Sequence, residues 1–167
     1  MVIGDLGDYR DLIPTIARWH FDRWGSLTGA STFDAYVALL TTAAQSRTAP
    51  SVLVASADGQ LLGSANLVAS DLPPRPHLTP WLGQLFVEPS RRRHGVGAAL
   101  VRAVLERARH CGYRRVYLYT GKTLPQYYRR LGWREIERVE YVARERTVMD
   151  FSLVAEEAPN HGIEPPR

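Results

Sequence analysis

The segment from Val87 to Leu100 constrains the fold of this chain more than any other stretch. It reads Val-Glu-Pro-Ser-Arg-Arg-Arg-His-Gly-Val-Gly-Ala-Ala-Leu and joins an apolar strand pattern to a helical one. Pro89 ends the strand, because proline cannot donate a ladder hydrogen bond. Gly95 and Gly97 let the backbone approach an anion closely, and the free N–H groups of a helix start face that anion. The segment therefore predicts a phosphate-binding turn between a strand and a helix.

Two common phosphate-binding motifs do not fit this turn. The Walker pattern needs Lys and then Ser or Thr after its last glycine, but Ala98 follows Gly97 here. The dinucleotide fingerprint needs a third glycine where this chain has Leu100. A different phosphate ligand is therefore expected. The simpler alternative is an Arg-rich helix start exposed to solvent, with glycines that bind nothing.

Two motifs together resemble the Gcn5-related N-acetyltransferase (GNAT) superfamily. Arg92-x-x-Gly95-x-Gly97 after a Val-x-Pro strand end is similar to the acyl-CoA pyrophosphate loop of that family. Tyr127-Tyr128-Arg-Arg-Leu-Gly-Trp is similar to its late Phe/Tyr-Tyr-x-x-Leu-Gly-Phe motif. A core aromatic under the sheet is the alternative for Tyr128. Two motifs in the family's order are more specific than either motif alone.

The resemblance implies an acetyl-CoA site. Backbone groups of Leu85, Phe86 and Val87 would hydrogen-bond the pantetheine arm as if it were one more strand. Tyr128 would protonate the departing thiolate, because a phenol is mostly protonated at neutral pH. The pyrophosphate would lie on the turn and the helix start, held by Arg92, Arg93, His94, Gly95, Val96, Gly97 and Ala98.

The function implied is an N-acetyltransferase that moves an acetyl group from acetyl-CoA to a primary amine of a small molecule, by direct attack in a ternary complex. One alternative is an acetyltransferase for protein N-termini or lysines. Another is a non-catalytic acyl-CoA-binding module, against which the intact Tyr128 argues. The expected partners are a small-molecule or peptide amine, without nucleic acid or membrane. A monomer and a homodimer fit the sequence equally.

No general base is evident on the strands beside the phosphate-binding turn. Many relatives carry a Glu there, whereas this chain has Gln84 and Tyr119 in that region and no carboxylate. Deprotonation would run through water to Asp71 or His77 in the loop before the strand, or the amine would bind in its minor neutral form. Ordinary turn residues are the simpler interpretation of both.

Charge is distributed unevenly along the chain. Residues 1–90 contain five Lys and Arg against eight Asp and Glu, whereas residues 91–146 contain fifteen against five. The basic part could attract nucleic acid, but its arginines lie in pairs at the ends of elements, without an aromatic-interleaved stripe or a helix-turn-helix signature. A polyanionic cofactor explains them with fewer assumptions.

The acidic first part predicts a cationic amine as the acceptor. The resemblance to the GNAT family implies that the acceptor pocket comes from the first two helices, their link and the loop before Trp81. Core packing for the aromatic residues and capping for the aspartates are the alternatives. The candidates are Asp22, Trp24, Asp34, Asp71, Trp81 and Tyr119.

Hydrophobic periodicity predicts strands and helices whose order is similar to the GNAT layout over 1–154, in one domain. The strand–helix–strand crossover at the glycine turn predicts an α/β fold with a mixed, partly parallel sheet and helices on both faces. The expected helices span 11–24, a segment after the N-cap Thr32, 97–110 and 124–131. The expected strands are a short start at Val2-Ile3, a hairpin of 51–57 and 60–68 around Asp58-Gly59, and then 81–87, 114–120, 133–142 and 145–154.

Composition agrees with one domain. The 167 residues are 45% hydrophobic, enough to bury a core. The single cysteine, Cys111, allows no internal disulfide, and the five histidines form no metal-binding pattern. Because the chain shows neither an apolar run of about 20 residues nor a signal-peptide layout at its start, we expect a cytoplasmic protein. Residues 155–167, with three prolines, are expected to form a loose tail.

Overall fold

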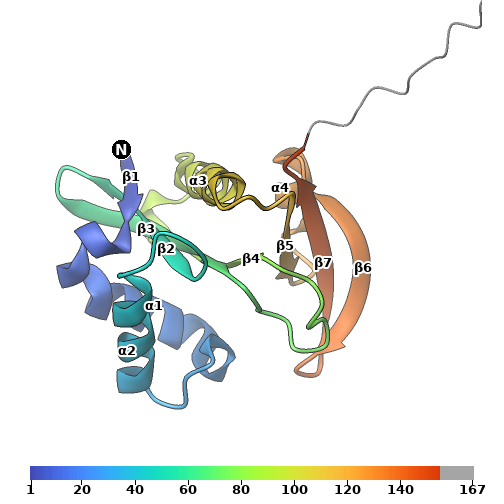
Figure 1. Cartoon of the computed structure of the whole chain (residues 1–167), viewed down its shortest axis with the longest axis horizontal. Helices are drawn as coiled ribbons and strands as arrows, with labels where there is room; N and C mark the ends of the chain where they lie inside the picture. Colours follow the sequence, from blue (N-terminus) through green and yellow to red (C-terminus); the bar gives the residue numbers. More distant parts are fainter. Residues whose placement is uncertain (155–167) are drawn as a thin grey trace, which may run out of the picture.

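A seven-stranded mixed sheet organises residues 1–154, which are the part of the chain described by the computed structural model (Figure 1). The expected tail, 155–167, lies outside the described residues. The strands follow the order β1-β2-β3-β4-β5-β7-β6, and every neighbouring pair is antiparallel except β4 and β5. The strands are Val2–Asp5 (β1), Ser51–Ala57 (β2), Gln60–Val68 (β3), Trp81–Val87 (β4), Arg115–Thr120 (β5), Arg134–Tyr141 (β6) and Arg144–Ser152 (β7).

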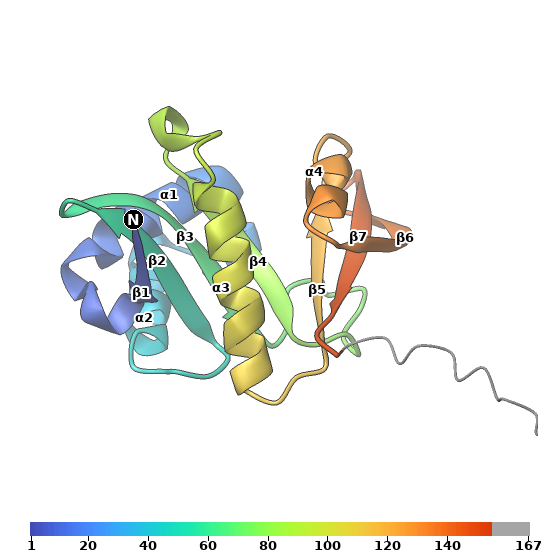
Figure 2. The same cartoon turned by 90° about the horizontal axis from the view of Figure 1, so that it is seen from above.

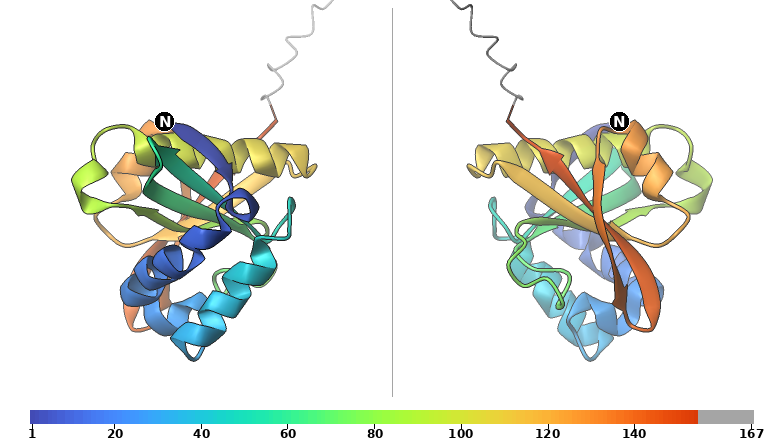
Figure 3. Two further views of the ribbon diagram at one scale, coloured as in Figure 1. Left: turned by 90° about the vertical axis from the view of Figure 1, so that its left-hand side faces the viewer. Right: turned by 90° about the vertical axis from the view of Figure 1, so that its right-hand side faces the viewer.

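Four α-helices cover the two faces of the sheet, as the sequence predicted. They are Ile13–Trp24 (α1), Phe33–Ala43 (α2), Val96–His110 (α3) and Pro125–Arg130 (α4). Figures 2 and 3 show α1 and α2 on one face and α3 on the other. Each face has its own buried cluster, with Ile16 and Leu40 on the first and Leu100 and Val104 on the second. No helix within residues 1–154 is long and apolar enough to cross a membrane.

Local sequence signals account for most element ends. The Thr32 side chain accepts a hydrogen bond from the Ala35 amide at 3.1 Å, so it caps α2 as expected. Asp58 and Gly59 both adopt positive φ, 51° and 73°, the backbone twist that a two-residue hairpin requires. The predicted start of the first helix at residue 11 is wrong, because residues 10–12 form a 3-10 turn before α1.

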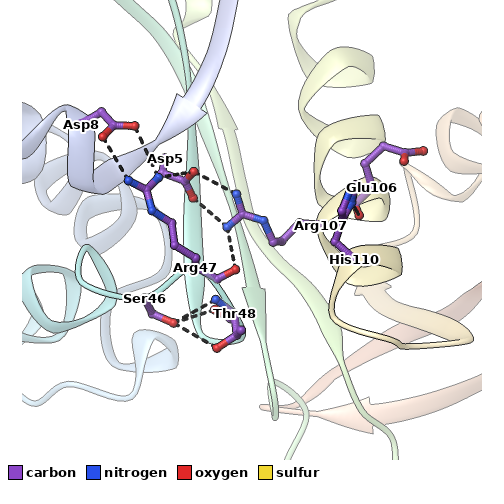
Figure 4. Close-up of polar contacts among 8 residues, drawn as sticks. All are labelled: Asp5, Asp8, Ser46, Arg47, Thr48, Glu106, Arg107 and His110. Atoms are coloured by element: carbon purple, nitrogen blue, oxygen red, sulfur yellow. Dashed lines mark hydrogen bonds and ion pairs between the residues drawn. The ribbon is translucent and has the colours of Figure 1, made fainter.

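An ion-pair cluster ties β1 to α3 (Figure 4). Arg107 lies 2.7 Å from Asp5 Oδ1 and 2.9 Å from its Oδ2. Arg47, between α2 and β2, also pairs with Asp5 and lies 3.2 Å from Asp8. Burial alone would raise the pKa of Asp5, but hydrogen bonds from Arg107 and Arg47 bring it below its ordinary value.

We expect Asp5→Asn to lower the free energy of unfolding by about 1–2 kcal/mol at neutral pH, because two arginines lose a charged partner. A lowered carboxyl pKa stabilises the folded state above about pH 4, and this contribution is lost as the pH falls through the lowered pKa. Urea unfolding at neutral and acidic pH measures both effects, and the two proteins should differ less in acid.

Asp8→Asn is the matched control for Asp5→Asn. The Asp8 pair with Arg47 is exposed, at 59% and 58% of the two side chains, and exposed ion pairs contribute little to stability. An equal loss of stability in the two variants would contradict the prediction.

Candidate active site

β4 and β5 are parallel neighbours that pair at a single register, Trp81 opposite Tyr117. A bulge lies just beyond that point: Gln84 adopts a φ of +41°, and the β3–β4 register shifts between Ser64 and Asn66. Because a bulge bends the strand that carries it, β4 leaves β5, as Figure 2 shows. Within the described residues, the β5-facing edge of 85–87 therefore has no ladder partner.

The turn after β4 combines positive backbone φ with a helix start. Arg93 and Gly95 adopt φ of 63° and 80°, and successive amides in such conformations form an anion-binding concavity. The first bond of α3 runs from the Ala99 amide to the Gly95 carbonyl oxygen, so the amides of 96–98 lack helical partners. The side chains of Arg92, Arg93 and His94 are exposed beside them. This arrangement fits a pyrophosphate.

Contacts with the β4 backbone and with an α4 side chain complete the turn. Arg92 donates a hydrogen bond from Nε to the Val87 carbonyl oxygen at 3.0 Å. A Cβ at Gly97 would lie 2.8 Å from the Tyr127 hydroxyl oxygen, so glycine at 97 admits this tyrosine to the start of α3. The sequence explained Gly97 only by approach to an anion, and the contact with Tyr127 depends on the tertiary fold.

Gly97→Val is expected to weaken acetyl-CoA binding by about 100-fold or more, because a β-branched side chain crowds amides whose hydrogen bonds to a charged ligand contribute roughly 1.5–3 kcal/mol each. Isothermal titration calorimetry measures the change. Arg91→Ala is the control, since Arg91 points to Gln60, at 2.8 Å from its Oε1, and should bind nearly normally. Normal affinity in a folded Gly97→Val protein would exclude this turn as the pyrophosphate site.

Tyr128 lies in α4 and is buried, with the residue 7% exposed. The ring packs edge-on against Tyr127 and Trp133, with centroids 5.1 Å and 6.1 Å away. Among residues 1–154 its hydroxyl has no hydrogen-bond partner. Burial, and to a smaller extent Tyr127, raise the pKa of Tyr128 above its ordinary value. The hydroxyl therefore stays protonated at neutral pH and can serve as a proton donor.

A carboxylate from the β3–β4 loop lies against β4. A Cβ at Gly83 would be 3.2 Å from Asp71 Oδ2, so Asp71 occupies the space that a side chain at this strand position would fill. Burial raises the pKa of Asp71 to about 7, against an opposing hydrogen bond from the Gln84 side chain. His77, the other loop candidate, is exposed. Asp71 can accept a proton near neutral pH.

The loop that carries Asp71 is anchored on both sides. Arg75 donates two hydrogen bonds of 2.6 Å to the Glu137 carboxylate on β6. The Trp81 indole donates to the Leu78 carbonyl oxygen at 2.7 Å. Leu72 is fully buried next to the aspartate. These contacts hold Asp71 at β4.

A buried polar chain beneath this carboxylate was not identified from the sequence. Asn66 donates to Gln84 Oε1 at 2.8 Å, and His20 bridges the hydroxyls of Tyr36 and Ser64 at 2.8 Å and 2.9 Å. Burial lowers the pKa of His20 to about 3, so this histidine stays neutral at physiological pH. The available signal was the pair of polar residues at alternate positions, 64 and 66, of an otherwise apolar strand.

Three of the predicted acceptor residues come together. Trp81 is buried and lies edge-on to Tyr119, with centroids 6.2 Å apart, and the charge of Asp71 acts on Tyr119. By contrast, Asp22 and Asp34 are exposed, and no hydrogen bond or ion pair joins either of them to this group within residues 1–154.

The remaining predicted acceptor residues have other local contacts. Asp22 pairs with Arg18 at 3.5 Å, and Asp34 lies in the first turn of α2, where an acidic residue favours the helix. Trp24 packs edge-on against Phe86 at 6.4 Å.

Diverging parallel strands followed by a helix start with free amides fit a transferase that uses an acyl-CoA. A model of the acetyltransferase (GNAT) family matches residues 13–133. The chain belongs to this family of acetyl-CoA-dependent N-acetyltransferases. A search of curated proteins finds no match.

Solved structures agree with this fold. An aminoglycoside 6'-N-acetyltransferase complexed with coenzyme A has a TM-score of 0.73 and 14% identity, covering 95% of this chain and 100% of its own. The protein yncA from Salmonella typhimurium, solved with acetyl-CoA, has a TM-score of 0.69 and 16% identity, covering 96% and 98%. Ribosomal-protein-alanine N-acetyltransferase from Brucella melitensis has a TM-score of 0.69 and 16% identity, covering 91% and 99%. At these identities the similarity to the solved structures extends to the fold alone.

Proposed function

We propose that this protein transfers an acetyl group from acetyl-CoA to a primary amine of a small molecule, by direct attack in a ternary complex. The observation that carries the proposal is the separation of β4 from β5 beyond Trp81 and Tyr117. It leaves a strand edge open between the phosphate-binding turn, which follows β4, and Tyr128, which lies in the helix that follows β5.

Three parts of the chain would hold acetyl-CoA. The amides of 96–98, with Arg92 and Arg93, would bind the pyrophosphate. The unpaired backbone groups of 85–87 would hydrogen-bond the pantetheine arm in the manner of an added strand. When bound, acetyl-CoA supplies a thioester whose carbonyl carbon is open to attack by an amine.

Asp71 and Tyr128 would move the protons. Asp71 takes a proton from the acceptor ammonium, directly or through water, and leaves a neutral amine that can attack. A nitrogen–carbon bond forms as the carbon–sulfur bond breaks, and Tyr128 gives its proton to the departing sulfur. The acetylated nitrogen then loses its second proton to the Tyr128 phenolate, directly or through water, which restores the tyrosine and leaves a neutral amide, while Asp71 releases its proton to solvent. The two groups suit these roles because burial keeps the tyrosine protonated, while the pKa of Asp71, raised to about 7, matches the working pH of a base.

Release of free thiol from acetyl-CoA tests the proposal, with a panel of amino acids, polyamines, aminoglycosides and peptides as acceptors. We expect turnover with a small amine. A folded protein that binds acetyl-CoA and acetylates no amine would exclude enzymatic transfer to amines. Turnover confined to peptides would replace the small-molecule acceptor with a protein one.

A further inference from the structure

Two opposite charges lie close to Tyr119 of β5. The guanidinium carbon of Arg146, on β7, is 6.0 Å from the centroid of the Tyr119 ring. Burial raises the pKa of Tyr119, the Asp71 carboxylate raises it further, and Arg146 opposes them. Tyr141 is edge-on to the same ring at 5.9 Å. A cation and an anion therefore share one aromatic neighbour, which packs against Trp81 at the start of β4.

Arg146 has no acidic partner among residues 1–154. Its Nε is buried and makes no hydrogen bond. Two acids of the β6–β7 hairpin pair with other residues, since Glu137 binds Arg75 and Glu145 lies 3.9 Å from Lys122. A partly buried guanidinium without a counter-ion is costly unless a ligand provides one, and its planar fork suits a carboxylate.

We propose that the acceptor is an amino acid or a similar zwitterion, whose ammonium binds Asp71 and whose carboxylate binds Arg146, with Tyr119 between them. The inference rests on the proposed acetyl transfer and names its substrate class. It also opposes a polycationic acceptor, because a second positive charge near Arg146 would be repelled.

Matched acceptors in the thiol-release assay test the inference: free amino acids, their decarboxylated amines and their methyl esters. The best amino acid should exceed its own amine and ester in kcat/KM by about tenfold or more, since charged hydrogen bonds discriminate by such factors. Arg146→Met should raise KM for that amino acid by about 10- to 100-fold and leave the decarboxylated amine nearly unaffected.

Arg144→Met is the matched control, because Arg144 is exposed two residues away on β7. Calorimetry with acetyl-CoA checks that each variant is folded. Should Arg146→Met lose acetyl-CoA affinity, Arg146→Lys takes its place; this variant keeps the charge without the fork, and it should raise the amino acid KM less strongly.

The outcomes separate this inference from the proposed function. Amines or esters that equal the amino acid, or equal effects of the variants at 144 and 146, would overturn the carboxylate site while acetyl transfer to amines stands. If no acceptor of any kind is acetylated, the proposed function fails and the zwitterion site fails with it.

Discussion

Tyr128→Phe is expected to lower kcat by roughly 10²–10⁴-fold and to leave acetyl-CoA affinity nearly unchanged, as is typical for the loss of a general acid. The substitution keeps the ring, and with it the edge-on packing against Tyr127 and Trp133, and removes only a hydroxyl that has no partner among residues 1–154. Single-turnover measurements with saturating acetyl-CoA report the chemical step, and calorimetry reports binding.

The neighbouring tyrosine supplies the control for this experiment. Tyr127 is half-buried, and its hydroxyl lies beside Gly97 at the start of α3. Tyr127→Phe should therefore change kcat little. If both variants reduce kcat equally, Tyr128 contributes packing, and another group must protonate the thiolate.

Asp71→Asn is expected to lower kcat/KM at neutral pH by roughly 10²–10⁴-fold, because an amide cannot accept the proton of the acceptor ammonium. In the wild type, kcat/KM should rise as the pH passes about 7, where Asp71 ionises. In Asp71→Asn the rise of kcat/KM near pH 7 should be absent. Activity should return only at alkaline pH, where the free amine becomes abundant. A pH profile of kcat/KM for both proteins measures this difference.

Stability distinguishes a base at position 71 from a structural residue. Burial raises the pKa of this carboxyl, so ionising it destabilises the folded state as the pH rises from about 4 towards 7, and the cost persists above that range. Asp71→Asn removes the cost and should be at least as stable as the wild type at pH 8. A large loss of stability at that pH would show that Asp71 holds the loop in place.

Local patterns in the sequence predicted most of the fold correctly. The helix after the glycine turn, the Thr32 cap and the Asp58-Gly59 hairpin each depend on residues within a few positions of one another. The formation of these three features therefore depends little on the rest of the chain. The start of α1 was misplaced because a 3-10 turn and an α-helix share the same apolar spacing over three residues.

The residues of the candidate site also differ in whether their neighbours are close or distant in the sequence. The predicted phosphate-binding turn and Tyr128 belong to contiguous motifs, so both could be proposed from the sequence, and their roles stay predictions. From the sequence, Asp71 was only one of several candidate residues. Its position against β4 depends on Gly83, twelve positions away, which leaves space for the Asp71 carboxylate. Arg146 was not identified, since nothing near it in the sequence indicates that Tyr119 lies beside it.

The sequence by itself therefore determined the order of elements, the family resemblance and the candidate residues for the cofactor, all of which follow from short-range spacing. Only the tertiary structure shows which candidate acceptor residues lie together. There, a bulge at Gln84 separates β4 from β5, and residues far apart in the chain meet around Tyr119. Burial then raises the pKa of Asp71 against a hydrogen bond from Gln84, and Arg146 is left with a buried Nε that makes no hydrogen bond within residues 1–154. Neither property exists before the sheet is assembled.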